Sequence, residues 1–166
     1  GLNMSADKLR ETIDKFYRYR SDTRLWYSID CNRPLLAVMP AHIMGWCGEL
    51  EKISAICAEL NIPLLEDAAE SLGSFIAPKK HSGTIGKMGA FSFNGNKILT
   101  TGGGGMIVTD DPDFARHAKH LSTTAKVDGV RYVHDEVGHN FRMVNILAAL
   151  GCSQLDKLPG RLTQKL

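Results

Sequence analysis

Residues Met88–Met106 read MGAFSFNGNKILTTGGGGM, and this stretch decides how the rest of the chain is interpreted. Apolar residues alternate with small or polar ones over Ala90–Phe93, a pattern typical of a β-strand. A glycine-containing turn, Asn94–Asn96, ends the strand, and Lys97 follows at once. A lysine amine held at such a place can form a Schiff base with an aldehyde cofactor once it is deprotonated. A solvated lysine in a hairpin loop is the alternative interpretation of the same pattern.

A second informative stretch lies upstream at Asn61–Gly73, which reads NIPLLEDAAESLG. The short apolar run Ile62–Leu65 predicts a buried strand that ends at acidic residues. Asp67 then stands at the carboxyl end of a strand, where open α/β sheets bind ligands. An aspartate that faces the pyridine nitrogen of pyridoxal phosphate (PLP) keeps that nitrogen protonated. We therefore expect Asp67 and Lys97 to face one PLP pocket from different strands.

The residues before Asp67 predict an α/β fold. Leu35–Met39 is a continuous apolar run closed by Pro40, which indicates a strand covered on both faces. Apolar residues at helical spacing over Glu49–Asn61 predict an amphipathic helix, which leads directly into the Ile62–Leu65 strand. A strand, a helix and a strand in this order predict two parallel strands with a right-handed crossover.

Capping residues and apolar spacing predict three further helices. Ser5 caps the first, which has Leu9, Ile13, Phe16 and Tyr17 on one face. The second begins at Asp111 and Pro112 and has Phe114, Ala115, Ala118 and Leu121 facing the core. The third covers Met143–Leu158 and ends at Pro159 and Gly160. A strand is predicted over Met106–Thr109, after a structured turn at Gly102–Gly105. Polar segments without a period predict loops at Ser21–Arg33, Ser74–Ser82 and Ser122–His139.

Composition excludes several classes of partner. The formal net charge is +2 and the basic residues are scattered, which argues against a nucleic-acid partner. The chain has neither an apolar run of about 18 residues that could span a membrane nor a segment resembling a signal peptide. The cysteines form no CxxC pair and are expected as buried or half-buried thiols: Cys31, Cys47, Cys57 and Cys152. These features predict a cytoplasmic protein without a nucleic-acid or membrane partner.

Two weaker patterns are interpreted as structural. Gly83–Lys87 has two residues between its glycines where a phosphate-binding P-loop needs four, so we reject that motif. His117 and His120 stand three apart on a predicted helix, with no carboxylate or cysteine at ligand spacing in the sequence. We expect a solvated histidine pair there and no metal site.

Three ordered motifs resemble the DegT/StrS family of PLP-dependent nucleotide-sugar aminotransferases. They are EDAAESLGS at Glu66–Ser74, GTIGKMGAFSFNGNK at Gly83–Lys97, and VGHNFRMVNILAALGCSQLDKL at Val137–Leu158. Within that family the chain is most similar to enzymes that aminate 4-keto sugars in the legionaminic-acid and bacillosamine pathways. The resemblance implies part of a fold-type I large domain, with a mostly parallel sheet and helices on both faces.

The resemblance also implies a role for each matching residue. Lys97 would hold PLP covalently, Asp67 would face the pyridine nitrogen, and Ser92 would bind the phosphate. The other matching positions are Glu70, which stands where many members have a glutamine against the ring; Asn140, which the family lends to the phosphate of a partner subunit; and His139 and Arg142, which belong to the substrate side. His139 replaces the usual tyrosine, Val144 the common proline, and Gly103 a more usual acidic residue. His42 matches a Pro-x-His-x-x-Gly segment near the pocket and is interpreted as structural.

The implied function is transamination of a nucleotide-linked 4-keto sugar with an amino-acid donor, glutamate being expected, in bacterial amino-sugar and surface-polysaccharide biosynthesis. The implied assembly is a homodimer with a shared active site. Residues 1–166 correspond to the central part of the family's large domain, and the family's N-terminal segment and small C-terminal domain have no counterpart in them. We expect these residues alone to bind PLP poorly and to be inactive. Two alternatives are a non-catalytic assembly module that retains the motifs, and a dehydratase of the same fold. The dehydratase branch carries histidine in place of the lysine, so Lys97 argues against it.

Overall fold

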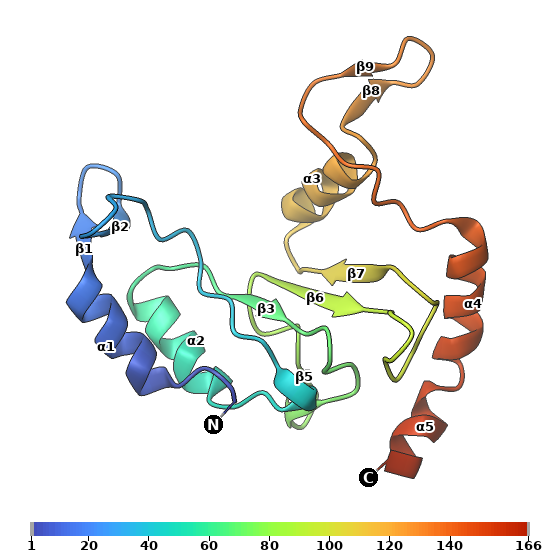
Figure 1. Cartoon of the computed structure of the whole chain (residues 1–166), viewed down its shortest axis with the longest axis horizontal. Coiled ribbons are helices and arrows are strands. Elements are labelled where there is room, and N and C mark those ends of the chain that lie inside the picture. Colours follow the sequence, from blue (N-terminus) through green and yellow to red (C-terminus); the bar gives the residue numbers. More distant parts are fainter. Residues whose placement is uncertain (1, 166) are drawn as a thin grey trace. The chain divides into compact units, whose positions relative to one another are not determined.

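The computed structural model describes residues 2–165, which form two compact units divided between Gly89 and Ala90 (Figure 1). The first unit contains α1 (Ala6–Phe16), β1 (Tyr17–Arg20), β2 (Leu25–Ser28), the one-turn helix η1 (Ile43–Gly45), α2 (Leu50–Glu59), β3 (Leu65–Asp67), β4 (Phe75–Ala77) and β5 (Lys80–His81). Strand β6 (Met88–Ser92) crosses the boundary between the units. The second unit contains β7 (Gly105–Val108), α3 (Pro112–Ser122), β8 (Lys126–Asp128), β9 (Val133–His134), α4 (Asn145–Leu155) and α5 (Leu158–Lys165).

The core of the first unit forms where α1 and α2 lie side by side (Figure 1). Its buried residues are Ala6 and Ile13 from α1, Leu50, Ile53 and Cys57 from α2, and Val38, Ile62 and Leu64 from the extended segments. Both predicted helices are confirmed, and the Ser5 side chain caps α1 by accepting from the Lys8 N–H. Tyr17 does not belong to the helix, because the chain turns into β1 after Phe16.

The parallel pairing predicted on either side of α2 is confirmed. Val38 pairs with Leu64 and Ala41 with Asp67, both in the parallel sense. The strand predicted over 35–39 is wrong in extent and in burial, since Leu36 and Met39 are 68% and 61% exposed. This segment makes isolated bridges, and only Val38 and Pro40 within 35–40 are buried, so it is not covered on both faces along its length.

The apolar run predicted a strand that begins at Ile62. Strand β3 begins instead at Leu65, and it includes both acidic residues, Glu66 and Asp67. Glu66 is buried within it. An acidic residue can occupy this position because hydrogen-bond donors surround its carboxylate in the interior, as described below.

The predicted loops 74–82 and 122–139 each contain an antiparallel hairpin, β4–β5 and β8–β9, and the predicted loop 21–33 contains β2, which pairs antiparallel with β1 just before it. These strands are only two to four residues long, too short for an alternating pattern to mark them in the sequence. Tyr19 and Trp26 pack across the first hairpin with ring centroids 5.6 Å apart. The chain is α/β, as predicted, and its strand pairing is mixed: parallel bridges occur beside these antiparallel hairpins.

The three-stranded sheet has the order β3-β6-β7. In the second unit β7 runs opposite to β6 (Figure 1). Phe91 and Phe93 are buried and Ala90 is exposed, which confirms the predicted alternation. The turn between the strands is structured, because the Phe93 N–H donates to Gly104 O (3.0 Å). Gly102 and Gly104 adopt φ of 81° and 86°, a backbone region that favours glycine.

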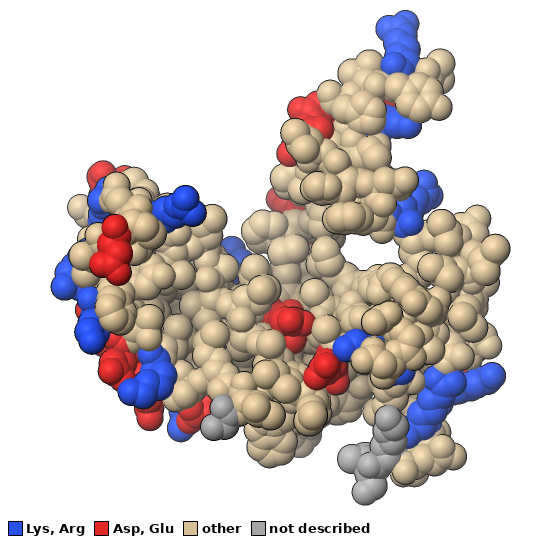
Figure 2. Space-filling model, viewed as in Figure 1, with Lys and Arg blue, Asp and Glu red and all other residues tan. Residues whose placement is uncertain are grey.

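The helices of the second unit depart from prediction in two ways. The expected core-facing stripe of α3 is not buried: Phe114 is 37% exposed and Ala115 is also exposed. The helix expected over 143–158 is shorter, since α4 ends at Leu155, and a further helix, α5, begins at Leu158, where Pro159 and Gly160 had predicted a stop. Pro159 lies in the first turn of α5, where a missing N–H costs little. Helix α4 carries no charged residue. In Figure 2 the red and blue of charged residues cover α1, and neither colour lies over α4.

Asp111 caps α3, and its replacement tests the boundary of this helix. Its Oδ1 accepts from the N–H groups of Asp113 (2.9 Å) and Phe114 (3.2 Å). We expect Asp111→Ala to lower the free energy of unfolding by about 1 kcal/mol, because two N–H groups lose their acceptor. Asp110→Ala removes the same charge one residue earlier and should change it by less than about 0.5 kcal/mol. Denaturant unfolding measures both, and equal losses would contradict the assigned cap.

Candidate active site

Lys97 lies in an anchored connection after β6. Its N–H donates to Asn94 O (3.1 Å), which closes a tight turn. Phe93 before the turn and Leu99 after it are both buried. The Ser92 hydroxyl accepts from the Asn94 N–H (3.3 Å), so the predicted phosphate-binding residue belongs to the same turn. The structure thus brings Ser92 and Lys97 together in one connection, with Lys97 half-buried.

Asp67 ends β3, where hydrogen bonds hold its backbone on both sides. Its N–H donates to Pro40 O (3.0 Å), and its carbonyl accepts from the His42 N–H (2.9 Å). Its Oδ1 accepts from the Ala69 N–H (3.2 Å). Glu70 is exposed and accepts from the Met44 N–H (2.7 Å). Asp67 and Glu70 therefore both contact the same short segment of the first unit, residues 40–44.

Glu66 is an anchoring residue that the sequence analysis missed. Its side chain is fully buried, and its Oε2 accepts from His42 Nε2 (2.9 Å) and the Gly83 N–H (2.7 Å). Its Oε1 accepts from the N–H groups of Ile85 (2.6 Å) and Gly86 (2.7 Å). The signal available in the sequence was an acidic residue next to Asp67 inside a strand, with a matching histidine upstream.

Burial raises the pKa of Glu66, but the hydrogen bonds from His42 and from the N–H groups of Gly86, Gly83 and Ile85 outweigh it, and the pKa lies below its ordinary value of 4.5. A lowered folded-state pKa gives a stabilisation that is present above pH 4.5 and is lost as the pH falls through the folded-state pKa. We expect the free energy of unfolding to fall from about pH 6 to about pH 3.5, and to fall less in Glu66→Gln. Urea unfolding at both pH values measures this. Equal acid sensitivity in the two proteins would contradict the assignment.

The residues predicted on the substrate side lie together on an exposed segment beside the end of α3. The His139 N–H donates to Leu121 O (2.7 Å), and Asn140 pairs with Thr123. The His139 and Phe141 rings are stacked with centroids 4.9 Å apart. Arg142 follows and is exposed. The segment therefore presents its side chains to solvent within the second unit.

The two histidines of α3 have carboxylate partners, contrary to the expectation from sequence. His117 Nε2 lies 2.9 Å from a Glu136 oxygen, and His120 Nε2 lies 2.6 Å from Asp135 Oδ1. The hydrogen bond from His120 lowers the pKa of Asp135. His120, Asp135 and Glu136 bring ligand-type atoms within 4.8 Å of one another, but these side chains are largely exposed. These side chains form hydrogen-bonded pairs that join the segment after β9 to α3.

The cysteines and a surface pocket complete the inventory of candidates. Cys57 is buried and Cys47 half-buried, as expected, but Cys31 and Cys152 are exposed, contrary to expectation.

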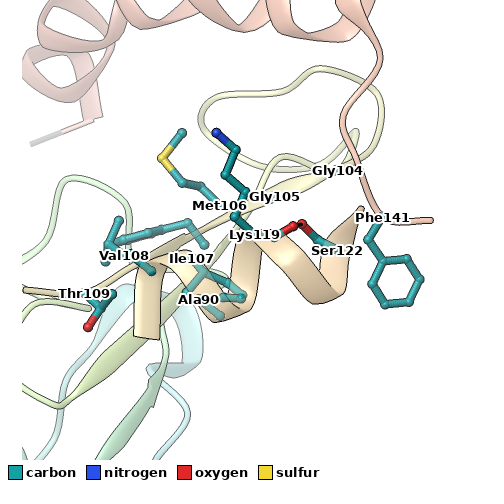
Figure 3. A pocket seen from close by; sticks show the side chains of 13 residues that line it. Ala90, Gly104, Gly105, Met106, Ile107, Val108, Thr109, Lys119, Ser122 and Phe141 are labelled. Carbon is teal, nitrogen blue, oxygen red and sulfur yellow. Dashed lines mark hydrogen bonds between the residues drawn. The ribbon is translucent and has the colours of Figure 1, made fainter. Parts of the chain in front are cut away.

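A pocket of about 750 Å³ lies between β7 and α3, lined by Met106, Ile107 and Lys119 among others (Figure 3). Neither Ser92 nor Lys97 lines it. Among residues 2–165, no helix is both long and apolar enough to cross a membrane.

Each unit by itself offers group types that PLP would use. The second unit offers a half-buried lysine amine and a serine hydroxyl on one anchored turn, and the first offers a half-buried carboxylate at the end of a strand. These are the group types that bind the aldehyde, the phosphate and the pyridine nitrogen.

The chain has the fold of the type I PLP-dependent transferases. Residues 26–166 match the DegT/DnrJ/EryC1/StrS aminotransferase family, and the chain belongs to this family. It superimposes with a TM-score of 0.79, at 25% identity, on a DegT/DnrJ/EryC1/StrS aminotransferase from Brucella abortus; the match covers 95% of this chain and 39% of that one.

Two curated relatives show the sequence similarity. The chain is 43% identical over 129 residues to EpsN of Bacillus subtilis, which its name places among pyridoxal phosphate-dependent aminotransferases; 78% of this chain and 33% of that protein are covered. It is 39% identical over 127 residues to the GDP-perosamine synthase of Vibrio cholerae, with 76% and 34% covered. The chain spans about a third of the length of these relatives.

Proposed function

We propose that this chain carries the covalent lysine and the ring-facing aspartate of a PLP-dependent aminotransferase that acts on a nucleotide-linked 4-keto sugar. The observation that carries the proposal is Lys97 on an anchored turn directly after β6, with Ser92 on the same turn, in a chain of this family. Residues 1–166 are the central part of the PLP-binding large domain in this proposal. The protein is proposed to be cytoplasmic.

PLP, when bound, supplies an aldehyde for the lysine amine and an electron-withdrawing ring. The Lys97 amine would hold the cofactor and, once released, would accept and return the proton of the reacting substrate carbon. The Asp67 carboxylate would keep the ring nitrogen protonated. The Ser92 hydroxyl would bind the phosphate, and Glu70 would belong to the ring side of the site.

The substrate side of the site is proposed to include residues of a partner subunit. Asn140 would reach the phosphate in a neighbouring copy of the chain, and His139 and Arg142 would contact the nucleotide sugar. Their exposure in the second unit is compatible with this role. Helix α4 supports a homodimer, because Ile146 and Leu155 are 82% and 56% exposed on an uncharged helix.

The amine is proposed to come from glutamate, and the product to enter bacterial amino-sugar and surface-polysaccharide biosynthesis. The name of the Vibrio cholerae relative supports a GDP-linked sugar, whereas the name of a Campylobacter jejuni relative, UDP-4-amino-4,6-dideoxy-N-acetyl-beta-L-altrosamine transaminase, supports a UDP-linked one. Amino transfer from glutamate to a GDP-linked and to a UDP-linked 4-keto sugar should be measured side by side. Turnover of one of them identifies the nucleotide.

The site of covalent attachment tests the proposal directly. We expect PLP to give the protein an absorbance band near the visible that borohydride abolishes, because reduction fixes the cofactor on the lysine. Peptide mass analysis should then find the pyridoxyl group on Lys97. A group on Lys79 or Lys87 would overturn the assignment. The absence of any fixed group would favour the alternative of a non-catalytic assembly module.

A further inference from the structure

The buried His42–Glu66 pair touches Asp67 but has no part in the proposed chemistry. Both side chains are fully buried, and they are joined by the 2.9 Å contact between His42 Nε2 and Glu66 Oε2. Two donors reach each oxygen of the Glu66 carboxylate. A carboxylate accepts about four such bonds, so this one is saturated and has a single available orientation.

His42 holds two adjacent residues of β3 at once. Its backbone N–H donates to Asp67 O (2.9 Å), and its imidazole binds the side chain of Glu66. Successive side chains of a strand project to opposite faces. Fixing Glu66 on the interior face therefore fixes the rotation of β3 about its axis, and with it the direction of the Asp67 carboxylate on the other face.

The protonation of the pair follows from its hydrogen bonds. His42 Nδ1 is buried and has no hydrogen-bond partner among the described residues. An imidazolium would leave a buried N–H unsatisfied at that atom, which is costly. We therefore assign a neutral imidazole with its proton on Nε2, donated to an ionised Glu66. The pair holds this proton in place and takes no part in proton transfer to a substrate, because solvent does not reach it.

The same segment also reaches Glu70. The Met44 N–H donates to Glu70 Oε2 (2.7 Å), and Met44 adopts φ of 54°, which is uncommon for a residue other than glycine. Such a conformation persists where the surrounding contacts impose it. Residues 42–44 thus hold both residues that the first unit would offer to the cofactor, Asp67 and Glu70.

We propose that His42 and Glu66 are positioning residues that fix the direction of the Asp67 carboxylate and thereby the affinity of the site for PLP. This inference rests on the proposed function, because it assigns Asp67 to the pyridine nitrogen. A carboxylate directed away from that nitrogen stabilises its proton less. The pair therefore controls the pH at which bound PLP loses the ring proton.

Three variants test the pair in the purified protein, with PLP added and its absorbance measured across the pH range. His42→Leu removes the donor to Glu66 and should weaken PLP binding about tenfold or more, by analogy with residues that orient a metal ligand. It should also move the pH midpoint of the bound-PLP absorbance change downward by about one unit. His42→Gln, whose amide nitrogen can reach the position of Nε2, should restore most of both. Glu66→Gln keeps the shape of the side chain and should reproduce the shift if His42→Leu does not fold.

Two controls separate positioning from general stability and from the proposed function. Ser82→Ala removes the hydroxyl that donates to Ser71 O (2.7 Å) in the same interior, without contacting His42 or Glu66, and should leave the pH midpoint unchanged. Asp67→Asn should shift the midpoint in the same direction as His42→Leu and further. If wild-type protein gives no band even at PLP concentrations that offset the weak binding expected of residues 1–166, the proposed function fails. If Asp67→Asn shifts the midpoint while His42→Leu and Glu66→Gln do not, the positioning role is overturned and the proposed function stands.

Discussion

Lys97→Arg is expected to abolish the borohydride-sensitive absorbance of the PLP-treated protein. A guanidinium stays protonated at neutral pH and cannot form the covalent bond to the aldehyde, although it keeps the positive charge and much of the length of lysine. In an active protein that contains these residues, loss of proton transfer by the Lys97 amine alone should lower the rate of amino transfer by about 10²- to 10⁴-fold. Absorbance, reduction followed by mass analysis, and amino transfer from glutamate measure the three effects.

Lys87→Arg is the matched control for this change. Lys87 lies directly before β6, whereas Lys97 follows it. The Lys87 N–H donates to Leu64 O (2.8 Å), a backbone bond that arginine retains. We expect this variant to keep the absorbance band and the rate of the wild-type protein. A full band in Lys97→Arg, or its loss in Lys87→Arg, would remove Lys97 from the site.

Gly89→Ala is expected to have the largest effect on stability. A Cβ at this position of β6 would lie 2.0 Å from Gly83 O, an atom of the backbone. Because no change of rotamer relieves an overlap with backbone, the connection between Gly83 and Gly89 must move, and it carries three N–H groups that bind Glu66. We expect a loss of about 3 kcal/mol or more in the free energy of unfolding, or failure to fold.

Gly160→Ala makes the same chemical change where the structure has room. Apart from its chain neighbours and the nearby backbone of its own helix, α5, no atom of the described residues lies within 4 Å of a Cβ added there. Alanine should therefore be neutral or stabilising by about 0.5–1 kcal/mol, because glycine loses more backbone freedom in a helix. Urea unfolding compares both variants with the wild-type protein. A Gly89→Ala protein as stable as Gly160→Ala would show that the backbone at Gly83 is not held as described.

The sequence by itself determined the elements whose signals are local. The apolar spacing of α2, the capping residues of α1 and α3, and the alternation of β6 each depend on residues within a few positions of one another, and the structure confirms them. Family membership was predictable for the same reason, because its motifs are continuous stretches of sequence, and residues 26–166 match the family. The roles of Lys97, Asp67, Ser92 and Asn140 stay predictions.

Only the tertiary structure decided which polar residues are buried and how the short strands pair. The hairpins β1–β2, β4–β5 and β8–β9 have no apolar period, and the exposed stripe of α3 has the same spacing that a buried one would have. Glu66 shows the physical reason most clearly. Burial of a carboxylate is unfavourable unless donors saturate it, and its donors come from His42 and from Gly83–Gly86, on segments that adjoin β3 only after folding.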